Sequence, residues 1–316
     1  AASMAELGHD VVGVDIDTHK VDLLSDGRAP FFEPELEELL ARNVDAGRLT
    51  FSENFSAIEG AQVHFISVGT PQSESGAADM SYVNVAVDSM LPHLGRCTAG
   101  PEVVAGKSTV PVGTASRLAQ TIERAGALLV WNPEFLREGF AVQDTLRPDR
   151  MVYGLPDDPG TAARAKEVMD AVYERILATG TPRLVMDYAT AELVKVSANA
   201  FLATKISFIN AMSQVCDAAG ANVTALAEAI GMDERIGSRF LRAGIGFGGG
   251  CLPKDIRAFQ ARADELGVGD APAFLAEVDR VNETMRAGVV QTAKELLGDN
   301  LTGATVTVLG AAFKPD

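Results

Sequence analysis

The chain has 316 residues, of which 43 are Asp or Glu and 27 are Lys or Arg, and its formal net charge is −16 at pH 7. This length, against a usual ~150 residues per domain, predicts at least two domains. The acidic balance argues against general nucleic-acid binding and against a basic membrane-docking face. It does not exclude an anionic small ligand, which needs only a few local donors.

Membrane and disulfide signals are also missing from the pattern. No apolar run reaches the ~18 residues of a transmembrane span, and no basic-then-apolar segment opens the chain. Three cysteines, Cys97, Cys216 and Cys251, lack CxxC spacing and are odd in number, so neither a disulfide framework nor a zinc site is predicted. We therefore expect a protein of the reducing cytoplasm.

The first half of the chain alternates short apolar runs with helical patterns. Strands are predicted at residues 10–17, 61–70, 102–110 and 128–135, and helices at 33–43, 81–94 and 114–125. This alternation indicates βαβ units, hence an α/β fold with a parallel sheet and helices on both faces. The ligand crevice of such a fold lies at the carboxyl ends of its strands.

The second half is helical. One long helix is predicted at 188–219, more helix to about Met232, and a further helix at 271–297. A strand predicted at 304–310 would open a third domain of α/β type. The predicted domains are therefore residues 1–187, 188–299 and 300–316.

Residues 1–8 suit the second half of a helix that ends at Gly8 and leads into the strand at 10–17. A dinucleotide-binding unit has a strand and a GxGxxG turn before such a helix. We therefore expect the first strand and the glycine turn of that unit, and most of the third domain, to be missing from this chain.

Polar residues follow several predicted strands. Asp15 lies where a Rossmann fold holds the ribose hydroxyls of NAD, and its carboxylate would repel the 2′-phosphate of NADP, although it could be an ordinary acidic turn residue. Thr70 and Thr109 end two further strands, as hydroxyl donors to a cofactor or as plain turn residues. Glu134, Arg137 and Glu138 follow the next strand, either as a surface salt bridge or as a water-activating base with its partner.

Lys195 and Asn199 are four residues apart and share one face of the long helix. The surrounding residues are mostly apolar, so much of this helix is expected to be buried. Lys195 could extend to solvent, or it could clamp an oxyanion or a substrate hydroxyl together with Asn199. Periodicity does not choose between these.

The segment GFGGGCLPKD at 246–255 carries the sharpest signal. Its four glycines allow a ligand to approach the backbone. Cys251 follows at a predicted helix start, where the free amides and the helix dipole favour a thiolate. Cys251 and Asp255 share a helix face, and we interpret Cys251 as a nucleophile, whereas Cys97 and Cys216 are typical of packing residues.

The sequence resembles the nucleotide-sugar 6-dehydrogenases over essentially its whole length. The motifs that carry the resemblance are NPEFLREG (132–139), AELVKVSANAFLATKISFIN (191–210), FLRAGIGFGGGCLPKD (240–255) and VLGAAFKP (308–315). The resemblance implies an NAD-binding Rossmann-like domain at 1–187 and a helical dimerisation domain at 188–299. Residues 300–316 would begin a nucleotide-binding domain.

The resemblance also implies roles for individual residues. Cys251 would be the catalytic thiol, Lys195 and Asn199 would hold the sugar and stabilise oxyanions, Asp255 with Thr109 would act on a water, and Glu134 would take part in general base chemistry. The implied NAD contacts are Asp15, Lys20, Thr70, Thr109, Glu138 and Lys254, with no metal. The implied substrate contacts are Glu134, Phe135, Leu136, Arg137, Glu138, Lys195, Asn199, Phe240, Leu241, Arg242, Ala243, Gly244, Gly248 and Lys314.

The implied reaction oxidises C6 of UDP-glucose to the carboxylate of UDP-glucuronate in two hydride transfers to NAD. A thiol explains how the second oxidation is possible, because an aldehyde is a poor hydride donor until a nucleophile adds to it. The alternatives are a GDP-mannose or UDP-N-acetyl-sugar 6-dehydrogenase, a β-hydroxyacid dehydrogenase, which needs no cysteine, or a non-catalytic binding module.

The two long helices have apolar residues around much of their circumference, so they must be covered on more than one side. We expect a homodimer through the helical domain, since two-fold dimers are the commonest assembly. The alternative is that the third domain covers the same face.

Overall fold

The computed structural model describes residues 1–298 and 301–310. The chain packs as two compact units. The first consists of Ala1–Thr70 and Met80–Lys195, and the second consists of Pro71–Asp79 and Val196–Asp316. The helix predicted at 188–219 therefore begins in the first unit and continues in the second.

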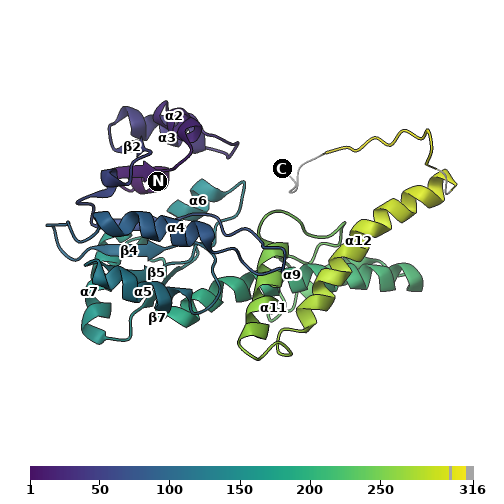
Figure 1. Ribbon diagram of the computed structural model, residues 1–316. Coiled ribbons are helices and arrows are strands. Elements are labelled where there is room, and N and C mark those ends of the chain that lie inside the picture. The colour runs from purple at the N-terminus through teal and green to yellow at the C-terminus, as the bar shows by residue number, and fades with distance from the viewer. Residues whose placement is uncertain (299–300, 311–316) are drawn as a thin grey trace. The chain divides into compact units, whose positions relative to one another are not determined.

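The first unit contains a five-stranded sheet in the order β3-β4-β5-β6-β7, with helices beside it (Figure 1). Its strands are β3 (Val63–Ile66), β4 (Val103–Gly106), β5 (Leu128–Trp131), β6 (Met151–Leu155) and β7 (Arg183–Asp187). All neighbours are parallel except β5 and β6, which pair antiparallel at Trp131 and Gly154. The predicted α/β fold with a parallel sheet is confirmed, and the antiparallel pair was not foreseen.

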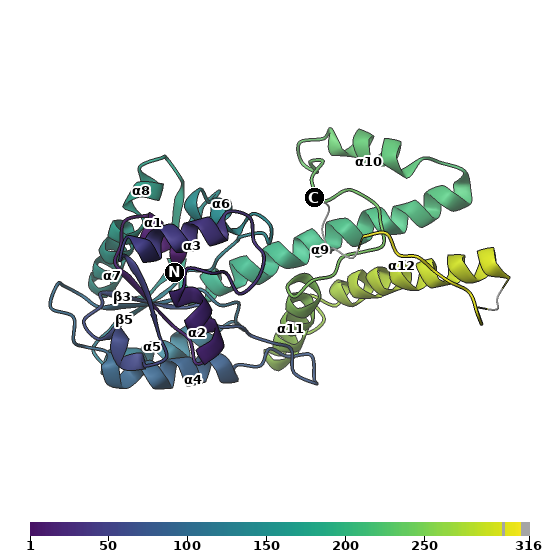
Figure 2. The ribbon, with the colours of Figure 1, turned by 90° about the horizontal axis from the view of Figure 1, so that it is seen from above.

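Strand residues alternate between two apolar layers, as the two-residue repeat of a strand requires. Val104 and Leu129 face a layer that includes α4 (Ser81–Met90) and α5 (Thr114–Arg124). Val130 and Tyr153 face a second layer that includes α7 (Pro159–Val172) and α8 (Glu174–Leu177). Figure 2 shows α4 and α5 together along one side of the sheet. Both faces of the central strands are therefore covered, which leaves the strand ends for polar residues.

A smaller element of the first unit is built on two parallel strands, β1 (Val11–Val14) and β2 (Leu49–Ser52). It has its own apolar core around Leu39, Leu40 and Leu49. The helices of this part of the chain are α1 (Ala2–Glu6), α2 (Thr18–Ser25), α3 (Leu36–Asp45) and α6 (Ala141–Leu146). The predicted helix at 33–43 instead begins at Leu36, because Glu35 before it adopts a left-handed conformation with φ 65°.

Helices make up most of the second unit. They are the part of α9 (Tyr188–Ala219) from Val196 onward, α10 (Val223–Gly231), α11 (Leu252–Glu265) and α12 (Phe274–Leu297). Ala203 of α9, Ile256 of α11 and Leu275 of α12 meet in one apolar core. Figure 2 shows α9 and α12 running side by side there. The predicted long helix has the predicted bounds, whereas the last helix begins at Phe274 because residues 270–273 form turns.

Residues 304–310 form no strand, contrary to the prediction. Val306 and Leu309 are 62% and 91% exposed. A β-strand is stabilised by hydrogen bonds to a neighbouring strand, and the described part of the chain supplies none at this segment. Among the described residues, no helix is long and apolar enough to cross a membrane.

Candidate active site

The loops after β3 and β4 are joined to each other by hydroxyl groups. Thr70 Oγ1 donates a hydrogen bond to the carbonyl oxygen of Thr109 over 2.8 Å, and Ser108 Oγ donates to the carbonyl oxygen of Val68 over 2.7 Å. These bonds bring two predicted cofactor residues, Thr70 and Thr109, together at the carboxyl edge of the sheet. The Thr70 hydroxyl thus links the two loops at the edge of the sheet where a cofactor is expected.

Asp15 and Lys20 lie together after β1. Lys20 Nζ is 3.4 Å from Asp15 Oδ2, and both side chains are exposed. Asp15 Oδ1 accepts a hydrogen bond from the backbone N–H of Asp17, and Asp17 caps the N-terminus of α2 through Lys20 N–H. The Asp17 N–H thus holds Asp15 Oδ1 and the Lys20 ammonium holds Asp15 Oδ2, while the carboxylate keeps part of its surface exposed to solvent. This arrangement fits a ribose diol, which needs a carboxylate oxygen as acceptor.

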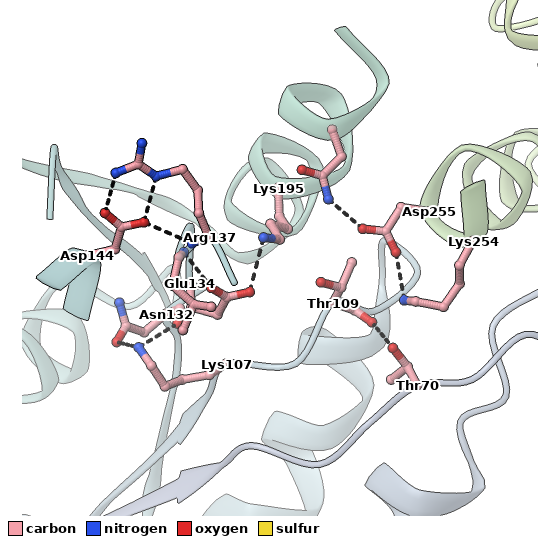
Figure 3. Close-up of polar contacts among 12 residues, drawn as sticks. Thr70, Lys107, Thr109, Asn132, Glu134, Arg137, Asp144, Lys195, Lys254 and Asp255 are labelled. Atoms are coloured by element: carbon pink, nitrogen blue, oxygen red, sulfur yellow. Dashed lines mark hydrogen bonds and ion pairs between the residues drawn. The ribbon is translucent and has the colours of Figure 1, made fainter. Parts of the chain in front are cut away.

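The loop after β5 brings Glu134 to Lys195. Lys195 Nζ donates to Glu134 Oε1 over 3.1 Å, and the Lys195 side chain is 9% exposed. The ring of Phe135 lies 5.5 Å from the same Nζ atom. Lys195 therefore does not extend to solvent, and its charge is held against a carboxylate at the sheet edge (Figure 3).

The first turns of α9 are anchored in the sheet unit, which fixes the position of Lys195. Tyr188 OH donates to the carbonyl oxygen of Leu129 over 2.8 Å. The buried carboxylate of Glu192 accepts hydrogen bonds from the N–H groups of Gly113 and Ala115 at the start of α5, over 2.7 and 2.6 Å. A carboxylate from another helix thus caps α5, where the helix dipole favours negative charge.

Arg137 does not pair with the neighbouring Glu134. Its guanidinium donates to both carboxylate oxygens of Asp144 in α6, over 2.8 and 2.7 Å, and this pairing raises the pKa of Arg137. Glu138 is exposed on the same loop. Arg137 therefore forms a surface salt bridge, as considered from the sequence, but its partner is Asp144. Glu134 forms its ion pair with Lys195 instead.

In the second unit, Asp255 is the centre of a separate polar group. Asn199 Nδ2 donates to Asp255 Oδ2 over 2.6 Å, and Lys254 Nζ donates to Asp255 Oδ1 over 2.7 Å. Asp255 is 2% exposed. Both oxygens of this buried carboxylate are therefore fixed in direction by charge or amide donors. Figure 3 shows the Lys254–Asp255 contact beside α11.

Cys251 is the residue immediately before α11, as predicted, and it is exposed. The N–H of Asp255 donates to the carbonyl oxygen of Cys251 over 2.9 Å, so the two residues are joined by the first hydrogen bond of the helix. The thiol-bearing residue thus lies at the positive end of the helix dipole, one turn before the buried carboxylate.

The glycine-rich segment is held by two asparagines that sequence reasoning missed. Asn282 of α12 accepts from Phe247 N–H over 2.7 Å and donates to Phe247 O over 3.0 Å. Asn210 of α9 accepts from Gly244 N–H over 2.9 Å. A Cβ on Gly246 would lie 2.3 Å from Asn282 Oδ1, so this glycine is required sterically. Asn210 lies in an apolar helical stretch, which was an available signal, whereas the charged neighbours of Asn282 gave none.

The predicted substrate segment 240–244 lies in the second unit. Phe240 has φ 63°, a left-handed conformation that is uncommon for a bulky residue. Leu241 is buried, whereas Arg242, Gly244 and Gly248 are exposed. Lys314, the remaining predicted substrate contact, lies outside the described residues.

The candidate residues are thus divided between the two units. The first unit holds Asp15, Lys20, Thr70, Thr109, Glu134, Phe135, Leu136, Arg137, Glu138 and Lys195, and the second holds Asn199, Phe240, Leu241, Arg242, Ala243, Gly244, Gly248, Cys251, Lys254 and Asp255. Each unit contains a carboxylate held by nitrogen donors, Glu134 by Lys195 in the first and Asp255 by Asn199 and Lys254 in the second, and such a set can polarise an oxygen and move a proton.

Two family models together match most of the chain. The NAD binding domain of the UDP-glucose/GDP-mannose dehydrogenase family matches residues 1–177, and the central domain of that family matches residues 189–284. The chain belongs to the UDP-glucose/GDP-mannose dehydrogenase family. This dehydrogenase is accordingly an NAD-dependent oxidoreductase.

Proteins named as UDP-glucose 6-dehydrogenases align with nearly the whole of this chain. A UDP-glucose 6-dehydrogenase of Rhizobium meliloti is 42% identical over 99% of the chain and 71% of that protein. UDP-glucose 6-dehydrogenase TuaD of Bacillus subtilis is 40% identical over 99% of the chain and 66% of that protein. A solved UDP-glucose dehydrogenase from Pyrobaculum islandicum is 40% identical, with a TM-score of 0.86, covering 94% of this chain and 68% of that one.

Proposed function

We propose that the protein oxidises the C6 alcohol of UDP-glucose to the carboxylate of UDP-glucuronate, with NAD as acceptor of both hydrides. The observation that carries this proposal is the exposed Cys251 at the start of α11, one turn before an Asp255 carboxylate held by Asn199 and Lys254. An alcohol-to-aldehyde oxidation needs no thiol. An aldehyde becomes a good hydride donor once a nucleophile such as a thiolate adds to it, which gives Cys251 a role in the second oxidation.

The choice of UDP-glucose follows the degree of similarity. The named UDP-glucose 6-dehydrogenases are 42% and 40% identical. A GDP-mannose dehydrogenase structure from Pseudomonas aeruginosa is 29% identical, with a TM-score of 0.69, and covers 95% of this chain and 68% of that one. These differences support the UDP-glucose branch over the GDP-mannose branch.

Bound NAD supplies the hydride acceptor. Asp15 would accept hydrogen bonds from the adenosine ribose, and Lys20, Thr70, Thr109, Glu138 and Lys254 would line the cofactor. The exposed Asp15 carboxylate would also disfavour a 2′-phosphate, since two negative charges would then meet.

Lys195 and Asn199 would hold the sugar oxygens, because an ammonium and an amide are the donors that an alkoxide requires. Asp255 and Thr109 would orient a water that takes the alcohol proton. Glu134, ion-paired with Lys195, would take part in general base chemistry. Residues 134–138 and 240–244, with Gly248 and Lys314, would contact the nucleotide sugar.

For the second oxidation, the Cys251 thiolate would add to the C6 aldehyde and form a thiohemiacetal, whose oxyanion Lys195 would stabilise. Loss of hydride from this adduct leaves a thioester. Water then adds to the thioester, the C–S bond breaks, and the carboxylate product and the thiol are released. Two hydrides leave the substrate in total, so two NADH form for each UDP-glucuronate.

We further propose that the protein is a cytoplasmic homodimer assembled through the second unit. Phe201, Phe208 and Val215 lie seven residues apart on α9 and are 66%, 49% and 57% exposed. A seven-residue repeat keeps side chains on one helix face. An apolar stripe of this kind favours burial against a second copy.

The test is the stoichiometry of NADH formation with UDP-glucose, GDP-mannose and UDP-N-acetyl-sugars. We expect two NADH per UDP-glucose and at least tenfold slower turnover of the other sugars. Cys251→Ser should stop at the aldehyde level, whereas the matched variant Cys97→Ser should keep two NADH per substrate. Full turnover by Cys251→Ser would contradict the thiol mechanism. NAD binding in calorimetry without turnover of any sugar would indicate a binding module instead.

A further inference from the structure

Lys107, which the mechanism above does not use, contacts the loop that follows β5 and carries Glu134. Lys107 directly follows β4, and its Nζ atom lies 3.0 Å from Asn132 Oδ1, 3.4 Å from Asn132 O and 3.3 Å from Tyr173 OH. The rings of Phe65 and Tyr173 lie 5.6 and 5.8 Å from this ammonium group. All three N–H donors of the ammonium therefore have acceptors, although the surrounding layer is apolar.

Asn132, the first residue after β5, is held at every polar atom. Its N–H donates to Gly106 O over 2.8 Å, and its Nδ2 donates to Val152 O over 2.9 Å. Its Oδ1 accepts from Lys107 and, over 2.8 Å, from Tyr173 OH, while its carbonyl oxygen faces Lys107. A buried residue with every group satisfied has a single available orientation.

Glu134 comes two residues later and is fixed from both ends. Its Oε2 atom accepts from the N–H of Leu136 over 2.7 Å, and its Oε1 atom accepts from Lys195. The polar chain therefore runs from Lys107 through Asn132 to Glu134 and Lys195 within one unit (Figure 3).

A cation at this place is costly, because burial disfavours the charged form. Burial lowers the pKa of Lys107 to about 8, and the negative charge of Glu134 acts in the opposite direction. An apolar side chain would pack against Phe65 and Tyr173 without this cost. The geometry therefore favours a role for the hydrogen bonds that the Lys107 ammonium donates to Asn132 and Tyr173.

We propose that Lys107 is a positioning residue, which fixes the loop after β5 through Asn132 and thereby holds the Glu134 carboxylate against Lys195. The catalytic part of this inference rests on the proposed function of Glu134. The structural part, an energetic link between Lys107 and Glu134, stands independently of any substrate.

The catalytic test is a double-mutant cycle in the full chain. We expect Lys107→Met to lower kcat for UDP-glucose oxidation by tenfold to a hundredfold, with both KM values changed less than threefold. In a Glu134→Gln background, Lys107→Met should lower the remaining rate by less than twofold, because its effect passes through Glu134. Lys107→Arg, which keeps the charge, should recover part of kcat, and Tyr173→Phe should cause a smaller loss than Lys107→Met.

Lys166→Met is the matched control, because Lys166 pairs with Asp170 at the surface and should leave kcat unchanged. Equal fold losses for Lys107→Met in both backgrounds, or no loss in the parent chain, would overturn the proposal.

The structural test is thermal unfolding without substrate. It compares the parent, Lys107→Met, Glu134→Gln and the double variant. A melting-temperature shift of the double variant that differs from the sum of the single shifts supports the link, and an additive shift refutes it. If no sugar is oxidised, the proposed function fails, while the unfolding cycle still decides on Lys107.

Discussion

Asn282 of α12 forms two hydrogen bonds with the backbone of Phe247, one from the N–H of Phe247 over 2.7 Å and one to its carbonyl oxygen over 3.0 Å. Asn282 has no exposed surface, so no solvent replaces these bonds when the side chain is changed. The bonds fix the segment that leads to Cys251.

Asn282→Leu should leave the N–H and carbonyl of Phe247 buried without partners. Each such group costs about 1–3 kcal/mol, so we expect the free energy of unfolding to fall by about 2–6 kcal/mol. The rate of alkylation of Cys251, measured by mass spectrometry, should also change. Asn222→Ala is the control, because Asn222 caps α10: it should cost about 1 kcal/mol and leave the alkylation rate unchanged. An equal alkylation rate in Asn282→Leu would show that the clamp does not position the thiol.

The ion pair between the buried Lys195 and the half-buried Glu134 predicts that loss of Lys195 is damaging. Lys195→Met should lower kcat by about 10²–10³-fold, the usual loss for one donor to an oxyanion. Steady-state kinetics with UDP-glucose measures this. Lys205→Met makes a matched change on the same helix, where Lys205 contacts the carbonyl oxygens of Ile236 and Gly237, and should change kcat less than threefold. Similar losses of kcat in Lys195→Met and Lys205→Met would show that the loss comes from a disturbed α9 and not from the missing Lys195 ammonium.

Glu35 provides a test of backbone strain. Its φ of 65° is the left-handed region, which costs a residue with a side chain about 1–2 kcal/mol and glycine almost nothing. Glu35→Gly should therefore raise the free energy of unfolding by up to about 1 kcal/mol, after the greater flexibility of glycine in the unfolded chain is included. Glu37→Gly, in the first turn of α3, should lower the free energy of unfolding by about 0.5–1 kcal/mol. Denaturant unfolding compares the two, and a destabilised Glu35→Gly would contradict the strain.

His64 predicts a loss of stability in mild acid. Burial lowers the pKa of His64 below its usual value, although Glu102, 2.9 Å away, acts in the opposite direction. The folded state then binds this proton less readily than the unfolded state, so stability falls as the pH drops below about 6.5. The melting temperature of the parent should fall more between pH 7 and pH 5.5 than that of His64→Gln. An equal fall in both proteins would assign the acid sensitivity to other groups.

The apolar stripe on α9 predicts the assembly state. Phe208→Glu places a charge in the middle of the stripe and should convert the dimer to a monomer in light scattering. Phe32→Glu is the control, since Phe32 is 92% exposed in the first unit and should leave the dimer intact. A parent chain that is already monomeric at micromolar concentration would rule the dimer out.

Local pattern in the sequence was sufficient to place the main elements and the thiol. The run from Tyr188 to Ala219 has helical spacing without Gly or Pro, and the helix has those bounds. The short apolar runs around residues 63–66 and 103–106 became strands of a covered sheet. Cys251 was predicted at a helix start, and it directly precedes α11, whose first turn contains Pro253. Each of these features depends on neighbours within a few residues, which the sequence displays directly.

The tertiary structure decided which polar side chains meet. Glu134 pairs with Lys195 and Arg137 with Asp144, although Glu134 and Arg137 are three residues apart in one loop. Asn282 reaches Phe247 across 35 residues. Residues 304–310 have the apolar alternation of a strand and form none, because a strand needs a partner that local sequence does not contain. Hydrogen bonds between distant residues depend on how helices and strands pack, and periodicity records only which face of each element is apolar.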